Sequence, residues 1–188
     1  MSGVNVIFAH DTETVLRAAV WLVNSLSPTD GDRLTERAQL DEFLTAERYS
    51  GDILGTAEEL RQVRALRPRL RRFWDVEDRD RAADLVNELL AECDARPYLI
   101  RHDELDWHLH LTRADQPLEQ RIAAETAMAF LDLIRTDEWS RLKLCAATDC
   151  EDVLVDLSRN RSKRFCDTGN CANRMHVTAY RARQRSLG

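Results

Sequence analysis

The chain has 188 residues, of which 44% are hydrophobic, and it carries a formal net charge of −6. This composition is ordinary for a globular protein that buries a core, so it argues against disorder over most of the chain. No apolar stretch approaches the ~20 residues that a membrane-spanning helix needs, and the first residues lack the basic start and apolar core of a secretion signal. We therefore expect a cytoplasmic protein that does not bind a membrane.

Apolar residues recur at helical spacing through the first hundred residues, as they do along one face of an amphipathic helix. Asp11 or Thr12 is placed to cap the first predicted helix, and Pro68 would kink or break the third. Cys93 falls on the apolar face of the fourth, where we interpret it as a small core residue rather than a reactive thiol. The spacing predicts four helices, at residues 15–26, 34–48, 57–74 and 82–93.

The period of the pattern changes near residue 98. Residues 98–100 and 107–111 have the pattern of short strands, and the polar residues 102–106 between them suit a hairpin loop. Pro117 then stands where the first residue of a helix is expected, and it opens a long helix through Ile134. The N-terminal part is therefore expected to be mainly α with one β-hairpin.

The second strand of this hairpin carries the side chains that could form a site outside the cysteines. His108 and His110 share one face and could bind a metal if another ligand joined them, although such histidines more often form a polar strand face. Trp107 on the other face suits a core position, or it could line a small-molecule pocket with His108 and Asn24. No phosphate loop, nucleophile elbow or catalytic triad spacing is present, so we do not expect an enzyme.

Four of the five cysteines form two pairs, which bracket a segment of hairpin length. This arrangement brings four thiolates to one tetrahedral zinc ion. Residues 153–157 can form a strand, 158–161 a turn and 162–166 the return strand, while Gly169 would relieve strain in the second knuckle. Disulfides or redox-active thiols are the alternatives, and disulfides would need an oxidising compartment. The predicted ligands of one structural Zn²⁺ are Cys145, Cys150, Cys166 and Cys171.

Charge is unevenly distributed along the chain. Residues 141–188 hold ten Lys and Arg against five Asp and Glu, so this segment carries +5 and residues 1–140 carry −11. A basic end on an acidic body suggests that the end binds a polyanion, and a solvated tail is the alternative.

Helical spacing after Cys171 gathers the basic side chains of the last segment into a stripe. The opposite side, with Ala172, Met175 and Ala179, could pack on the hairpin. A helix has about the right width for the major groove of double-stranded DNA, and arginines can contact its phosphates. The candidate nucleic-acid contacts are Arg159, Arg161, Lys163, Arg164, Asn173, Arg174, Arg181 and Arg185.

These C-terminal motifs resemble the CGNR zinc-finger family. Members of that family have an Asp-x-Ser strand end, an Arg/Asn-rich turn, an aromatic residue before the third cysteine and a Cys-Gly-Asn-Arg signature that opens a basic helix. The corresponding residues here are Asp156-Leu157-Ser158, Arg159-Asn160-Arg161, Phe165-Cys166 and Cys171-Ala172-Asn173-Arg174. Two departures are Ala172 in place of glycine and Phe165 in place of tryptophan.

The N-terminal part resembles the companion ABATE-type domain of the same family, in Leu22-Val23-Asn24-Ser25, in the hairpin and in the helix after Pro117. The resemblance implies a bacterial, stress-related transcriptional regulator whose finger binds DNA and whose body senses a signal or assembles. We expect an α-rich domain over residues 1–140 and a small treble-clef-like zinc finger of knuckle, β-hairpin and helix over 141–188.

Three functions from different classes remain open at this point. The first is a zinc-stabilised regulator that binds double-stranded DNA, for which a homodimer on two half-sites is expected. The second is a protein-interaction module that binds no nucleic acid. The third is a body that binds a small-molecule effector or acts as an enzyme, with His108 and His110 at its site.

Overall fold

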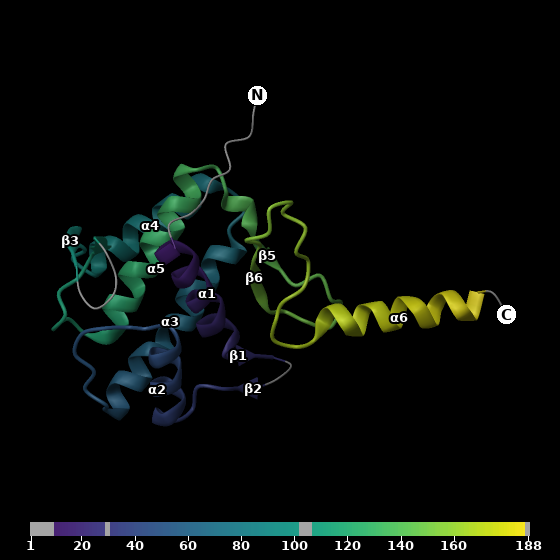
Figure 1. Ribbon diagram of the computed structural model, residues 1–188, viewed down its shortest axis with the longest axis horizontal. Coiled ribbons are helices and arrows are strands. Elements are labelled where there is room, and N and C mark those ends of the chain that lie inside the picture. The colour runs from purple at the N-terminus through teal and green to yellow at the C-terminus, as the bar shows by residue number, and fades with distance from the viewer. Residues whose placement is uncertain (1–9, 29–30, 102–106, 187–188) are drawn as a thin grey trace.

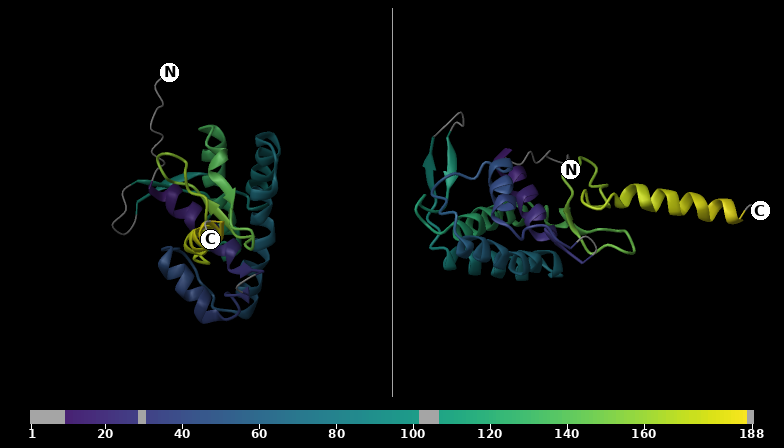
Figure 2. Two further views of the ribbon diagram at one scale, coloured as in Figure 1. Left: turned by 90° about the vertical axis from the view of Figure 1, so that its right-hand side faces the viewer. Right: turned by 90° about the horizontal axis from the view of Figure 1, so that it is seen from below.

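The computed structural model describes residues 10–28, 31–101 and 107–186 (Figure 1). Helix α5 packs against α1, α3 and α4 to form the body, and the cysteine-rich region joins the body through β5 and β6. Helix α6 extends away from that region (Figures 1 and 2). The elements are α1 His10–Asn24, β1 Leu26–Ser27, β2 Gly31–Asp32, α2 Arg37–Ala46, α3 Ala57–Asp75, α4 Arg79–Glu92, β3 Tyr98–Ile100, β4 His108–His110, α5 Leu118–Arg135, a 3₁₀ turn Trp139–Arg141, β5 Leu142–Leu144, β6 Val153–Val155 and α6 Cys171–Ser186.

The predicted helices of the body are confirmed, with ends that differ by a few residues. The sequence predicts a kink or a break at Pro68, and α3 continues without a break from Ala57 to Asp75. Pro68 faces solvent, while Leu66, Leu70 and Phe73 on the same helix are buried in the core. Burial of these side chains offsets the hydrogen bond that proline removes.

The core of the body is built on aromatic contacts between α3 and α5. The rings of Phe73 and Phe130 lie 4.3 Å apart between centroids, and Trp74 meets Phe130 edge to face at 5.5 Å. Cys93 is buried at the end of α4, and burial raises the pKa of its thiol to about 11. This confirms that it is a core residue with little thiolate character.

The β-structure of the body exceeds the single predicted hairpin. Tyr98–Ile100 pairs with His108–His110 as expected, with Leu99 opposite Leu109. A second antiparallel pair joins Leu26–Ser27 to Gly31–Asp32 after α1. Periodicity does not reveal strands of two residues, and here a polar network rather than a hydrophobic pattern holds them.

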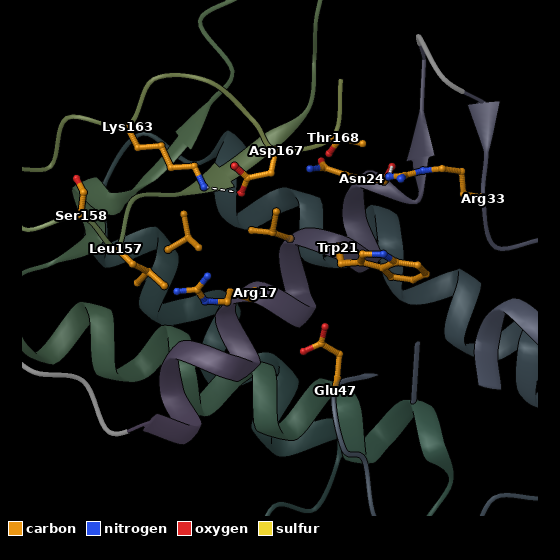
Figure 3. Close-up of a pocket in the computed structure, with 12 residues that line it drawn as sticks. Arg17, Trp21, Asn24, Arg33, Glu47, Leu157, Ser158, Lys163, Asp167 and Thr168 are labelled. Carbon is orange, nitrogen blue, oxygen red and sulfur yellow. Dashed lines mark hydrogen bonds and ion pairs between the residues drawn. The ribbon is translucent and has the colours of Figure 1, made fainter. Parts of the chain in front are cut away.

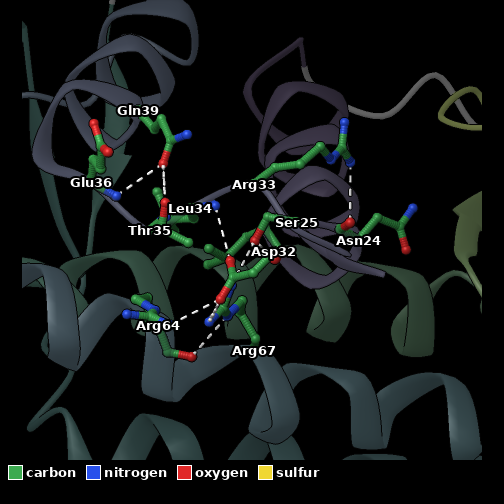
Figure 4. A network of polar contacts seen from close by, with 11 residues as sticks. Asn24, Ser25, Asp32, Arg33, Leu34, Thr35, Glu36, Gln39, Arg64 and Arg67 are labelled. Carbon is green, nitrogen blue, oxygen red and sulfur yellow. Dashed lines mark hydrogen bonds and ion pairs between the residues drawn. The ribbon is translucent and has the colours of Figure 1, made fainter. Parts of the chain in front are cut away.

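The polar network centres on Asp32 (Figure 4). Its carboxylate accepts hydrogen bonds from the buried Arg67 at 2.7 Å and from Arg64 at 2.9 Å. The hydrogen bond from Arg67 is the largest contribution to lowering the pKa of Asp32 to about 2. The carboxylate is thus ionised at any pH near neutrality, and it ties β2 to α3.

The hairpin of the cysteine-rich region differs from the predicted one. Residues 162–166 form no strand, and β6 instead pairs with β5, with Lys143 opposite Leu154. Residues 162–166 do not pair with β6 as predicted, because residues 158–166 turn around the buried Asp156. Its carboxylate accepts hydrogen bonds from Ser158 N at 3.0 Å and from Lys163 N at 2.8 Å.

Strand β6 lies between two clusters of buried side chains. Val153 and Val155 belong to the core of the body, whereas Leu154 between them packs with the four cysteines. Alternate residues of a strand point to opposite faces, so one short strand serves both clusters. The division into domains at residue 140 stays a prediction.

Two side chains of the body bind the backbone of β6. Asn24 donates through Nδ2 to Val153 O at 2.9 Å and accepts from Val153 N at 2.8 Å, and Trp74 Nε1 donates to Leu154 O at 3.0 Å. These bonds are buried, so they satisfy backbone groups that water cannot reach.

Within the described part of the chain, no helix combines the length and the apolar character needed to cross a bilayer.

We expect Asn24→Ala to lower the free energy of unfolding by about 2 kcal/mol, because it leaves two buried backbone groups of Val153 without partners. Asn87→Ala on the exposed face of α4 is the matched control and should change stability little. Urea unfolding followed by circular dichroism measures both. Equal stability of the two variants would contradict this role for Asn24.

Candidate metal centre and nucleic-acid interface

The four clustered cysteines come from two knuckles that face each other. Cys145 and Cys150 lie on the connection between β5 and β6, and Cys166 and Cys171 begin and end the segment that leads into α6. The backbone hydrogen bond from Cys145 N to Asp152 O at 2.9 Å closes the first knuckle, and the one from Ala146 N to Arg164 O at 2.8 Å links it to the segment of the second.

The sulfur atoms have the geometry of a tetrahedral zinc site. One Sγ from each of the four cysteines lies within 4.8 Å of every other. The Sγ distances are 3.8 Å from Cys150 to Cys166 and 3.6 Å from Cys166 to Cys171. Zn–S bonds of ~2.3 Å in a tetrahedron place the sulfurs about 3.8 Å apart, so the spacing fits zinc and is much too long for an S–S bond.

Burial opposes the ionisation of the thiols in the cluster. Burial raises the pKa of the Cys166 thiol to about 11, and it raises the pKa of Cys150 further. Burial acts in the same direction on Cys145, but N–H groups of Ala147 and Cys166 hydrogen-bond its sulfur and lower its pKa overall. Four thiolates this close together repel one another, and a bound metal ion offsets that repulsion. Four sulfur ligands leave no position on the metal for a substrate.

The left-handed residue in the second knuckle is Asn170, with φ of 51°, and not Gly169 as the sequence suggested. Asparagine tolerates this conformation better than most residues with a side chain. Asn170 O then accepts from Arg174 N, so the turn leads directly into α6, whose first residue is the ligand Cys171.

Arg174 lies against the metal site. Its guanidinium donates to Cys171 Sγ at 3.1 Å, and it pairs with Asp149 through contacts of 2.8 and 3.2 Å. Asp149 belongs to the first knuckle and Cys171 to the second, so Arg174 connects the two. A positive charge beside a ligand sulfur also offsets part of the −2 charge of a zinc–tetrathiolate cluster. The sequence pattern indicated Arg174 only as a nucleic-acid contact.

Other predicted contacts at the tip of the loop also have partners in the protein. Arg161 pairs with Glu138 at 2.7 Å, and Lys163 pairs with Asp167 at 2.6 Å. Arg164 is exposed and lies over the ring of Phe165, and Arg159 is exposed. The loop is fixed from beneath by Lys143, whose Nζ contacts Asp156 at 2.6 Å and Arg161 O at 2.7 Å.

Sequence reasoning missed these supporting residues. Glu138 is buried and also pairs with Arg141 at 2.7 Å, while Arg141 donates to Asp156 O at 2.7 Å. The position of Asp156 in an Asp-x-Ser sequence was the one available signal, because Asp and Ser in this spacing commonly bond their own backbone.

Helix α6 is exposed beyond its first turn. Met175 packs partly against the cysteine cluster, but Ala172 and Ala179 are exposed, so the expected packing of this side on the hairpin is wrong. The helix leaves the knuckles pointing away from the body (Figures 1 and 2). Asn173 and Arg181 are exposed, and Arg185 lies in the last turn, where side chains are outside the described part.

The proposed pocket of Asn24, Trp107 and His108 is not assembled. Asn24 is bound to β6, whereas Trp107 directly precedes β4, and β3, the strand that pairs with β4, lies at the other end of the body (Figure 1). Trp107 is 64% exposed with Arg101 over its ring, so the alternative that it is a core residue is also wrong. The side chain of His108 and the loop 102–106 lie outside the described residues.

We expect one zinc per chain in the purified protein and none in Cys166→Ser, because only three of the four sulfur ligands remain. Cys93→Ser changes a buried cysteine outside the cluster and should keep its zinc. Elemental analysis of both variants measures this. Full zinc content in Cys166→Ser would exclude the site.

Arg174→Gln should release zinc to a chelator about 10-fold faster than the unchanged protein, because it removes the contacts with Cys171 and Asp149. Arg181→Gln on the same helix touches neither knuckle and should release zinc at the original rate. Equal rates in the two variants would show that Arg174 does not support the metal site.

Comparison with protein families gives two matches. Residues 141–184 match the CGNR zinc finger, and residues 16–137 match a family described as "putative stress-induced transcription regulator", the ABATE domain. No curated protein matches the chain. The second match covers more than half of the chain, and the first contains all four clustered cysteines, which supports one structural zinc. This chain therefore belongs to the ABATE family of putative stress-induced transcription regulators and carries a CGNR zinc finger at its C-terminal end.

Proposed function

We propose that this protein is a non-catalytic, cytoplasmic regulator that binds double-stranded DNA through its zinc finger. The observation that supports this most directly is the character of α6. The helix has no acidic residue, is exposed after its first turn and begins at a zinc ligand. At 16 residues it is about 24 Å long, and its width suits the major groove.

The partners of each basic residue divide the candidate contacts into two groups. Arg161, Lys163 and Arg174 form ion pairs within the protein, so they orient the loop and the helix in this proposal. Arg159, Arg164 and Arg181 are exposed, and no carboxylate lies within 4 Å of them in the described part of the chain. These three supply phosphate contacts, and the exposed Asn173 is positioned for a base edge.

The second candidate is a protein-interaction module, which the exposed apolar residues of α6 favour. Tyr180 is 57% exposed and Val177 is 39% exposed on this helix. A partner protein, or a second copy of the chain bound to an adjacent half-site, could cover them.

Fluorescence anisotropy with a labelled duplex separates the two functions. We expect the logarithm of the binding constant to fall linearly with the logarithm of salt concentration. The magnitude of this slope should drop by about 0.9 for each phosphate that the protein no longer neutralises. Replacing Arg159, Arg164 and Arg181 together by Gln should therefore lower both affinity and slope. Arg81→Gln on α4 is the matched control in the body.

Absence of binding at low salt would contradict the DNA-binding proposal and favour the protein-interaction module. The same conclusion would follow if the triple variant bound DNA with the affinity and salt slope of the control.

A further inference from the structure

A cleft lies between the body and the zinc finger (Figure 3). One wall is α1, with Arg17, Trp21 and Asn24, and the opposite wall is the segment from Val155 to Thr168. Its volume is about 620 Å³, which is within the range of pockets for small organic ligands.

The charged side chains that line the cleft do not balance. Arg17, Arg33 and Lys163 are cationic, whereas Glu47 and Asp167 are anionic, which leaves one positive charge in surplus. Lys163 and Asp167 neutralise each other through their ion pair at 2.6 Å. Burial raises the pKa of Glu47, and the nearby charge of Arg17 acts in the opposite direction. The cleft as a whole therefore matches a ligand with a single negative charge.

Arg33 is the cation of the cleft that has a buried hydrogen-bond donor left without an acceptor among the residues that the structure describes. Its Nη2 donates to Asn24 O at 3.1 Å, and no carboxylate lies within 4 Å of it in the described part of the chain. Its Nε is buried and has no acceptor among the described residues. Arg17 is 65% exposed, and its ion pair with Glu13 is long at 3.8 Å. Arg17 and Arg33 lie toward opposite ends of the cleft (Figure 3), so a single carboxylate would find its partner in Arg33.

The floor of the cleft is apolar and partly aromatic. Trp21 is held in place by stacking on Phe43, with 4.6 Å between ring centroids and 16° between planes. Val20, Val155 and Leu157 complete this surface. The side chain of Asn24 binds β6 through both its nitrogen and its oxygen.

We propose that this cleft binds a small organic monoanion, a carboxylate carried on an apolar frame the size of an aromatic ring. Arg33 holds the carboxylate, and the frame lies on Trp21 and the aliphatic side chains beside it. Arg17, toward the other end of the cleft, adds to its positive potential (Figure 3). Thr168, on the far wall, belongs to the second zinc knuckle and lies three residues before α6. The ligand thus contacts the body and the finger together, and its binding does not depend on the DNA-binding proposal.

Benzoate is a suitable probe, and benzamide is its neutral counterpart of equal size. In ¹H–¹⁵N spectra of the zinc-loaded full chain, we expect saturable shifts with benzoate at the amides of Trp21, Arg33 and Thr168. Benzamide should bind about tenfold more weakly than benzoate, because it lacks the negative charge that the arginines stabilise.

Arg33→Gln should weaken benzoate binding by about tenfold, because it removes the partner of the carboxylate. Arg17→Gln should weaken it less, and Arg96→Gln, an exposed arginine beside the β3–β4 hairpin, should leave it unchanged. If Arg33→Gln does not fold, the comparison of benzoate with benzamide in the unchanged protein still tests the need for a negative charge. The proposal is overturned if benzoate gives no saturable shift, if shifts occur only elsewhere, if benzamide binds equally well, or if folded Arg33→Gln binds benzoate as tightly as the unchanged protein.

Discussion

Strand β6 is the constraint on which the rest of the structure depends. Its central residue, Leu154, packs with the zinc ligands, while Val153 and Val155 pack in the core of the body. Asn24 and Trp74 bind its backbone from the body side. A finger of this size buries too little apolar surface to be stable by itself, so the metal on one face and the body on the other supply the missing stability.

The zinc site determines where α6 begins. The two knuckles then determine the direction in which the helix extends from the site. Asn170 turns the chain in a left-handed conformation, Cys171 binds the metal, and Arg174 connects the two knuckles through Cys171 and Asp149. The last two residues of the Cys-Ala-Asn-Arg sequence therefore have different surroundings, since Asn173 is exposed and Arg174 is engaged. In our proposal the engaged arginine orients the helix, and exposed arginines farther along it contact DNA.

Sequence reasoning predicted the parts of the molecule that follow from spacing. The helical periods placed the helices of the body, and the paired cysteines identified the metal site, because both signals repeat over many residues. The β5 strand and the support of the loop by Lys143 and Glu138 were not predictable, since they depend on contacts between residues 13 to 23 positions apart. Trp107 was misplaced because strand alternation indicates which residues share a face but not which face is buried.

In our proposal zinc fixes the knuckles and thereby presents α6 to DNA. The most direct test is duplex binding by one protein sample from which zinc is removed in steps and then restored. We expect the bound fraction to fall in proportion to the zinc removed and to recover when zinc is added, while most of the helical circular dichroism of the body remains. Unchanged DNA binding by the zinc-free protein would contradict this role for the metal.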